Sequence, residues 1–295
     1  MKNKNIVVFT VLLLNFLSLY AQKTNYVIFV NGYRGYGLNN YTSDLAIINP
    51  EIKRTVPSDS AFKSDAWIIG YWRNELFNLD DSILKHYEKP KPLYIDGHHP
   101  MGTSSHYNKF RLASSWIKSR LFFFCRTQKH ILNTKNNSPG FYLRFENGKK
   151  VGKKLIQLLD LKNDSLKISI VCHSMGFAVA LGIINELKGK VCFHDFLILS
   201  PEQANLARCD WSIFRYVWHY SPSWNKGKYR IVVNQDGISP QCFVYGLPNT
   251  KFTGLVDIPK KSTHYKLGFN RSHHLSYYNW FLNYNKGERG FYGDY

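Results

Sequence analysis

Short apolar runs alternate along the chain with longer segments whose apolar residues recur at helical spacing. The runs at 26–30, 166–174 and 193–201 are bounded by Gly, Pro or polar residues, which is typical of fully buried strands. The runs at 65–72 and 228–240 have the same character, and the segment 91–110 is predicted to begin as a strand and continue as a polar loop.

Helical segments lie between these predicted strands. Residues 147–161 place Val151, Leu155, Leu158 and Leu159 on one side of a helix, and 176–190 reads as a small-residue helix that ends at Gly189. A third, basic helix is predicted within 111–133. Because strands and helices alternate and the strands are apolar throughout, we expect an α/β fold with a mostly parallel central sheet and helices on both faces.

The N-terminus has the pattern of a secretory signal peptide. Lys2 and Lys4 precede an apolar segment from 6 to 19, and Ala21-Gln22 offers a cleavage point. We therefore predict a leader at 1–21 and a secreted or periplasmic domain at 22–295. An uncleaved N-terminal anchor is the alternative, although the apolar segment is short for a membrane-spanning helix.

The net charge indicates which binding partners are favoured, and the cysteine spacing excludes some metal and redox motifs. The net charge is +19, spread over short lysine clusters without a long basic tract. This balance favours contact with anionic surfaces such as a membrane and argues against a dedicated nucleic-acid arm. The five cysteines contain no CxxC pair, so zinc knuckles and CxxC redox motifs are excluded, whereas a bridge between Cys209 and Cys242 stays open.

One stretch carries specific chemistry: ISIVCHSMGFAVALGI, residues 168–183. A predicted strand ends here, a small-residue helix begins, and Ser174 lies between them. A sharp turn of this kind exposes a serine hydroxyl beside backbone N–H groups, and it demands small residues two positions before and after the serine. Cys172 and Gly176 occupy those two positions, and the helix N-terminus adds partial positive charge.

With this stretch, the chain resembles the α/β-hydrolases of the lipase and esterase type, whose turn often reads G-H-S-M-G. The order of motifs extends the resemblance over roughly residues 24–285. It implies that Ser174 is a nucleophile and that no cofactor is needed. It also implies an oxyanion hole formed by backbone N–H groups of Met175 and of the Gly32-Tyr33 turn, which follows the first strand.

The same resemblance implies that the acid and the base follow the serine in the order Ser, acid, His. Within the predicted segment 228–240, Asp236 lies just past the end of the buried strand and is the first candidate for the acid, with Glu202 as the alternative. His274, followed by Leu-Ser, is the first candidate for the base, with His273 as the alternative. His264 is predicted to be a surface residue.

Two insertions are expected to border the site. Residues 91–135 and 201–227 are predicted to be lid-like, and the aromatic part at 210–224 reads equally as a lid or as ordinary helix packing. The first insertion contains Asp96, His98, His99 and His106. These residues can form a metal set, but adjacent histidines diverge in extended chain, so a role at the rim of the cleft is the preferred interpretation and no metal is predicted.

The sequence thus predicts an exported serine hydrolase that cleaves an ester, with a lipid or acyl ester as substrate and contact with an anionic membrane. Thioesters, amides and acyl transfer use the same groups and stay open. One alternative is a non-catalytic binding protein for acidic glycan or lipid on the same fold. Another is a secreted lipase-type antibacterial toxin.

Overall fold

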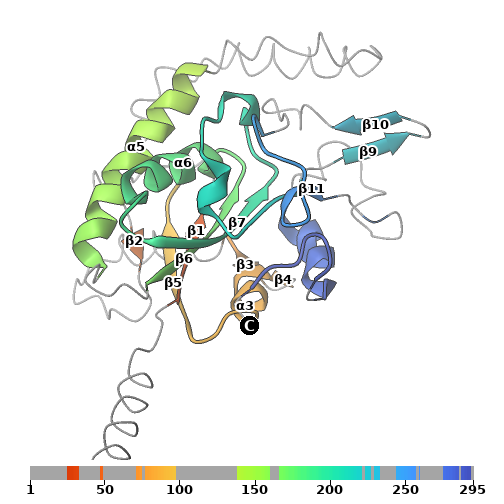
Figure 1. The fold of residues 1–295 in the computed structure, drawn as a ribbon, viewed down its shortest axis with the longest axis horizontal. Helices are drawn as coiled ribbons and strands as arrows, with labels where there is room; N and C mark the ends of the chain where they lie inside the picture. Colours follow the sequence, from red (N-terminus) through yellow and green to blue (C-terminus); the bar gives the residue numbers. More distant parts are fainter. Residues whose placement is uncertain are drawn as a thin grey trace, which may run out of the picture.

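The computed structural model describes residues 25–32, 47–48, 71–74, 77–97, 138–159, 166–220, 223–226, 229–232, 244–256, 259, 275–285 and 287–293. A seven-stranded sheet lies at the centre of this part of the chain (Figure 1). In spatial order its strands are β11 (Thr253–Val256), β8 (Tyr216–Tyr220), β7 (Cys192–Leu199), β6 (Lys167–His173), β1 (Asn25–Val30), β5 (Pro90–Ile95) and β2 (Ile47–Ile48). The six strands from β11 to β5 are parallel, and β2 pairs antiparallel with β5 at one edge.

The order in which the chain adds strands to the sheet reverses between β1 and β6. The chain passes from β1 outward to β5 and then returns to the other side of β1, where β6, β7, β8 and β11 follow in order. β1 and β6 are paired from Asn25 and Lys167 to Val30 and Cys172. In an open α/β sheet, ligands bind at the carboxyl ends of the two strands where the order reverses. The residues that follow Val30 and His173 therefore lie at the expected ligand position.

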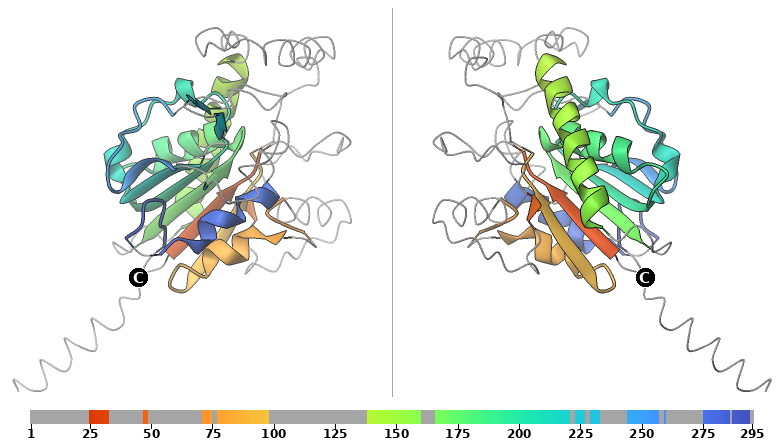
Figure 2. Two further views of the ribbon diagram at one scale, coloured as in Figure 1. Left: turned by 90° about the vertical axis from the view of Figure 1, so that its right-hand side faces the viewer. Right: turned by 90° about the vertical axis from the view of Figure 1, so that its left-hand side faces the viewer.

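Helices cover both faces of the sheet (Figure 2). The helices α5 (Ser138–Leu158) and α6 (Gly176–Leu187) pack on one face, against alternate strand residues such as Ile28 and Val30. The short helix α3 (Leu79–Leu84) and the 3₁₀ helix η8 (Leu275–Asn283) pack on the other, against Val27 and Phe29. Each central strand is buried on both sides, which explains its uninterrupted apolar sequence.

Glycines allow α5 and α6 to cross in direct backbone contact. A Cβ placed on Gly182 of α6 would lie 2.1 Å from the carbonyl oxygen of Phe145 and 2.8 Å from the Cα of Gly148, both in α5. A Cβ on Gly148 would lie 2.1 Å from the carbonyl oxygen of Val179. No side chain fits between the two helices at this level, so both positions require glycine.

The remaining short elements lie outside the central sheet. β3 (Arg73–Asn74) and β4 (Phe77–Asn78) form a small antiparallel pair before α3. β9 (Ser223–Lys226) and β10 (Tyr229–Val232) form a second antiparallel pair. The 3₁₀ helices η4 (Ala204–Leu206) and η5 (Trp211–Ile213) follow β7.

Most predicted elements of the described chain are confirmed, and the α/β architecture with them. The strands expected at 26–30, 91–110, 166–174 and 193–201 appear as β1, β5, β6 and β7, and the helices at 147–161 and 176–190 are α5 and α6. α5 begins earlier than predicted, at Ser138, and Leu158 is 60% exposed although the pattern placed it on the buried side. The predicted basic helix within 111–133 and the first six residues of the predicted strand 65–72 lie outside the described residues.

Two predictions about the C-terminal half were wrong. The strand expected at 228–240 exists as β10, but it pairs only with β9 and is not part of the central sheet. The next central strand is instead β8, which lies inside the segment read as a lid or a packed helix. β8 runs between β7 and β11, and its side chains are buried on both faces of the sheet, Val217 on one face and Trp218 and Tyr220 on the other.

Candidate active site

Ser174 occupies the sharp turn between β6 and α6, at the carboxyl end of the sheet. Its backbone is left-handed, with φ +55°, a conformation that L-residues rarely adopt. The serine N–H donates to the carbonyl oxygen of Leu199 at 3.0 Å, and its own carbonyl oxygen accepts the N–H groups of Phe177 at 3.1 Å and Glu202 at 3.2 Å. These three bonds hold the strained turn between the end of β7 and the first turn of α6.

The turn is closed against the loop after β1 by glycines. A Cβ on Gly176 would lie 2.5 Å from the carbonyl oxygen of Asn31 and 2.6 Å from that of Val30. A Cβ on Gly97 would lie 1.9 Å from the Asn31 oxygen. The glycine two positions after the serine is thus explained by backbone contact with β1, while Cys172, two positions before it, is a fully buried core residue.

Asn31 joins the loop after β1 to the loop after β5. Its side-chain amide donates to Asp96 Oδ1 at 3.3 Å and to the Gly32 carbonyl oxygen at 3.0 Å, and its Oδ1 accepts the Gly97 N–H at 3.2 Å. Asn31 is completely buried and Asp96 nearly so. This network fixes Gly32, one of the predicted oxyanion-hole residues, beside the serine turn.

Gly32 packs so closely against Ser174 and Tyr71 that no side chain fits at this position. A Cβ placed on it would lie 2.7 Å from the Cβ of Ser174, 2.8 Å from the hydroxyl oxygen of Tyr71 and 3.0 Å from the carbonyl oxygen of His173. The Tyr71 hydroxyl also forms a hydrogen bond with Nδ1 of the buried His173. Ser174, Gly32 and Tyr71 therefore converge on one point at the edge of the sheet.

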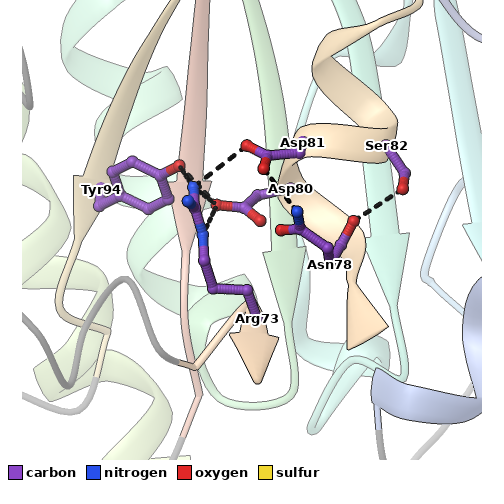
Figure 3. A network of polar contacts seen from close by, with 6 residues as sticks. All are labelled: Arg73, Asn78, Asp80, Asp81, Ser82 and Tyr94. Atoms are coloured by element: carbon purple, nitrogen blue, oxygen red, sulfur yellow. Dashed lines mark hydrogen bonds and ion pairs between the residues drawn. The ribbon is translucent and has the colours of Figure 1, made fainter. Parts of the chain in front are cut away.

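Tyr71 is held in place by the residues that follow it. Trp72 is completely buried, with its ring centroid 5.2 Å from that of Phe29 in β1. Arg73 forms an ion pair with the buried Asp80, which also accepts the Tyr94 hydroxyl at 2.6 Å (Figure 3). Figure 3 also shows Asp81, Asn78 and Ser82 around the start of α3.

The pKa shifts in this network follow from burial and charge. Burial and the neighbouring Asp80 raise the pKa of Tyr94, so the phenol stays protonated and donates to the carboxylate. The pKa of Arg73 is raised by its hydrogen bond and charge interaction with Asp80, which together outweigh the opposing effect of burial. Asp80 is thus a buried carboxylate whose charge is balanced by Arg73 and which also accepts a hydrogen bond from the Tyr94 hydroxyl.

A narrow gap, too small to hold a water molecule, lies next to Met175 on the α5 side. It is lined by residues from the start of α5, from the first turn of α6 and from the chain after β7: Phe141, Arg144, Met175, Ala178, Glu202 and Gln203. Met175 is the N-cap of α6, so its N–H belongs to the positive end of that helix, as the predicted oxyanion role requires. Arg144 and Glu202 are both largely buried.

Of the predicted catalytic residues, the structure brings Ser174, Gly32, Met175 and the alternative acid Glu202 to one edge of the sheet. Asp236, His273, His274 and Tyr33 lie outside the described residues, as do His98, His99 and His106. Since β10 is not in the central sheet, the strand before Asp236 does not support the acid in the way that was predicted. Asp96, the described member of the histidine-rich loop, bonds Asn31.

The chain that directly follows His274 packs near the serine. Tyr278 of η8 forms a hydrogen bond with the hydroxyl of Ser200, donates to the Tyr220 carbonyl oxygen at 3.2 Å, and has its ring centroid 6.4 Å from that of His173. η8 is therefore anchored at the carboxyl ends of β6, β7 and β8.

Sequence reasoning missed Tyr71, Arg144 and Tyr278. Each lies far along the chain from Ser174 and belongs to no motif, so no local spacing marks it. Among the described residues, no group of three or more His, Cys, Asp or Glu side chains is placed to hold a metal ion. No helix in the described ranges combines the length and apolarity needed to cross a membrane.

Comparison of the chain with protein-family models, with curated proteins and with solved structures gives no match.

Proposed function

We propose that this protein is a serine hydrolase of the α/β-hydrolase type, with Ser174 as nucleophile. One observation carries the proposal: Ser174 is a non-glycine residue with φ +55° at the strand-to-helix turn where the sheet reverses its order. A strained backbone persists only where its surroundings over-determine it, and such positions cluster at active sites. A turn of this shape is what a nucleophilic serine on an α/β sheet requires.

The proposed reaction is acyl transfer in two steps. His274, or His273 in its place, takes the proton of the Ser174 hydroxyl as the oxygen attacks the ester carbonyl carbon. The carbonyl π electrons move to oxygen, and backbone N–H groups at Met175 and Gly32-Tyr33 stabilise that oxyanion. The histidine then protonates the leaving alcohol. A water molecule, deprotonated by the same histidine, then attacks the acyl carbon. The bond from that carbon to the Ser174 oxygen breaks, the histidine returns its proton to Ser174, and the acid is released.

The direction of the strands supports the proposal that the acid and the base lie at the same edge of the sheet as Ser174. β8 and β11 run parallel to β6, so the chain leaves Tyr220 and Val256 at the same edge of the sheet at which it leaves His173. Asp236 lies on the connection after β8, and His273 and His274 lie on the connection after β11. Glu202 is retained as the alternative acid, because its backbone bonds that of Ser174 directly.

The proposed substrate is a lipid or acyl ester, met after export to the periplasm or the medium. The leader pattern at 1–21 supports export, and the net charge of +19 favours substrates presented on an anionic membrane.

Labelling with a fluorophosphonate tests the nucleophile. We expect the wild-type domain 22–295 to react at one residue, found at Ser174 by peptide mass mapping, and Ser174→Ala to be inert. Ser200→Ala is the matched control, because Ser200 is also a buried serine in the left-handed region at the end of a strand, with φ +43°. Ser200→Ala should label like the wild type.

Four further variants assign the partners. Labelling should be lost in His274→Ala and kept in His273→Ala, and it should fall more in Asp236→Asn than in Glu202→Gln. The reverse result for the two histidines would make His273 the base, and the reverse result for the two carboxylates would make Glu202 the acid. A folded wild-type protein that reacts with no fluorophosphonate and hydrolyses no p-nitrophenyl ester would refute the hydrolase proposal and favour a non-catalytic binding protein.

A further inference from the structure

The outer face of α5 carries a cluster of lysines. Lys149, Lys150, Lys153 and Lys154 lie within two turns of the helix, and the last three are exposed. α5 lies on the outside of its layer and faces the viewer in the right-hand view of Figure 2. Glu146, the single acidic residue of α5, forms an ion pair with Lys149 at 2.9 Å. The exposed face of α5 therefore keeps the positive charge of the other three lysines.

The spacing of these lysines opposes the stability of the helix. Residues four apart are neighbours on a helix surface, and like charges at that spacing destabilise the helix. Lys149 and Lys153 form one such pair, and Lys150 and Lys154 form another. A helix that served only to cover the sheet would be more stable with glutamate at one position of each pair. The repeated like charges thus favour a role in binding negative charge.

Apolar side chains lie on the same face. Tyr142 and Leu143, near the start of α5, are 56% and 42% exposed. Residues seven apart lie within about 20° of each other around a helix, so Leu143 points in nearly the same direction as Lys150. Apolar side chains beside lysines fit the boundary between the headgroups and the acyl chains of a bilayer. The single arginine of α5, Arg144, is buried, although arginine is the residue that nucleic-acid recognition favours. The composition of this face therefore favours a lipid surface over a nucleic acid.

The apolar end of this face is the end of α5 nearest to Ser174. Arg144 lines the narrow gap next to Met175, the residue after the serine. Farther along the helix, a Cβ on Gly152 would lie 2.7 Å from the Cβ of Glu186, near the end of α6. α5 and α6 thus begin at the same edge of the sheet and run away from it together. A bilayer bound to the exposed face of α5 lies beside the edge that holds the proposed nucleophile.

We propose that the exposed face of α5 is a docking surface for an anionic lipid bilayer. Lys150, Lys153 and Lys154 bind the lipid phosphates, and Leu143 enters the headgroup layer at the end next to the serine turn. The link to a lipid substrate rests on the serine hydrolase function proposed above, whereas the binding itself does not require a reactive Ser174.

Sedimentation of the chain 22–295 with lipid vesicles tests this surface. The chain 22–295 retains every residue that the structure describes and lacks the apolar segment at 6–19, which by itself would bind lipid. It should bind vesicles of equimolar phosphatidylglycerol and phosphatidylcholine, and it should not bind vesicles of phosphatidylcholine alone. Each lysine near an anionic bilayer strengthens binding about fivefold, so Lys150→Gln with Lys154→Gln should weaken it about 30-fold. This double variant should be at least as stable in urea as the wild type, because it removes a like-charge pair.

Lys85→Gln with Lys89→Gln is the matched control. These lysines are also exposed and four residues apart, but they lie at and after the end of α3, on the opposite face of the sheet. The control changes the net charge by the same amount. It should bind like the wild type, because salt screens charges that lie more than about 10 Å from the lipid. Equal losses in the two double variants would show that binding depends only on net charge, and they would overturn the proposal.

Leu143→Ser and Leu158→Ser test how the helix lies on the bilayer. Both leucines are exposed on α5, but Leu158 is near its other end and about 80° from Lys150 around the helix. Insertion of the exposed part of one leucine strengthens binding about fourfold. Leu143→Ser should lose this contribution, and Leu158→Ser should bind like the wild type. An equal or greater loss in Leu158→Ser would overturn the placement of the serine edge beside the bilayer.

Failure of the docking surface and failure of the proposed function give different results. Ser174→Ala should bind vesicles like the wild type. A protein that binds vesicles through α5 and hydrolyses no ester refutes only the hydrolase function, and one that hydrolyses esters without binding vesicles refutes only the docking surface. Unchanged vesicle binding by Lys150→Gln with Lys154→Gln, together with weaker binding to duplex DNA, would assign this face to nucleic acid and overturn the proposal.

Discussion

Replacement of Ser174 by glycine and, separately, by alanine measures the backbone strain at the proposed nucleophile. Both changes remove the hydroxyl, so their difference isolates the Cβ atom in the left-handed backbone at φ +55°. An L-residue in that region is destabilised by roughly 1–2 kcal/mol relative to its ordinary conformation. Glycine escapes this strain but loses more chain entropy on folding, at a cost of about 0.5–1 kcal/mol.

The two effects leave Ser174→Gly more stable than Ser174→Ala by about 0.5–1 kcal/mol. Ala180→Gly supplies a control of opposite sign. Ala180 is completely buried in α6, where glycine costs about 1 kcal/mol in helix propensity. The lost methyl group removes roughly a further 0.8 kcal/mol of apolar burial. Glycine should therefore be more stable than alanine at position 174 and less stable than alanine at position 180.

Urea unfolding followed by circular dichroism is the appropriate assay, because it compares free energies at one temperature. With an m-value of about 3 kcal/mol/M, a difference of about 1 kcal/mol moves the midpoint by roughly 0.3 M, provided that m is equal in the variants. If Ser174→Gly is less stable than Ser174→Ala, as at Ala180, then the turn carries no strain. The observation on which the hydrolase proposal depends would then be lost.

Three further predictions concern the scaffold and the thiols. Gly182→Ala should lower the free energy of unfolding, measured with urea, by about 2 kcal/mol, because the methyl group would lie 2.1 Å from the Phe145 carbonyl oxygen and force the helices apart. A stabilised variant would contradict the backbone contact. Arg73→Ala should lower the free energy of unfolding by about 2 kcal/mol, because it leaves Asp80 buried without its cation. In a double-mutant cycle, adding Asp80→Asn should recover about half of that loss. Additive losses would show that the two residues are not coupled. At pH 8, iodoacetamide should modify the exposed Cys192 and spare Cys172 and Cys209. Burial raises the pKa of both spared thiols, that of Cys209 to about 12, and so suppresses their reactive thiolates; modification of Cys172 in the folded protein, detected by peptide mass mapping, would contradict its burial.

Local pattern was sufficient to predict the central part of the fold. β1, β6, β7 and α6 are each encoded by an apolar run of the right length with turn residues at its ends. The serine turn was predicted for the same reason, since the strand, the serine and the helix that define it are contiguous in sequence.

The errors arose where two segments have similar local patterns and differ in their partners. The runs at β8 and β10 are both short, apolar and aromatic, yet only β8 enters the central sheet, while β10 pairs with β9. Leu158 is an error of another kind, because it lies just outside the face that α5 presents to α6 and the sheet. A periodic pattern gives the type of an element, but the identity of its neighbours depends on contacts with residues far along the chain.

The sequence by itself determined that this protein has a parallel α/β core and a serine at a strand-to-helix turn, because both depend on residues within one or two elements. Only the tertiary structure decided what surrounds that serine. Tyr71 and His173 are 102 residues apart, yet their side chains are hydrogen-bonded beside Gly32. Sheet pairing between β1 and β6, together with the burial of Trp72 against Phe29, brings these three segments together. Such a meeting point is fixed by long-range packing and leaves no mark in the local spacing of residues.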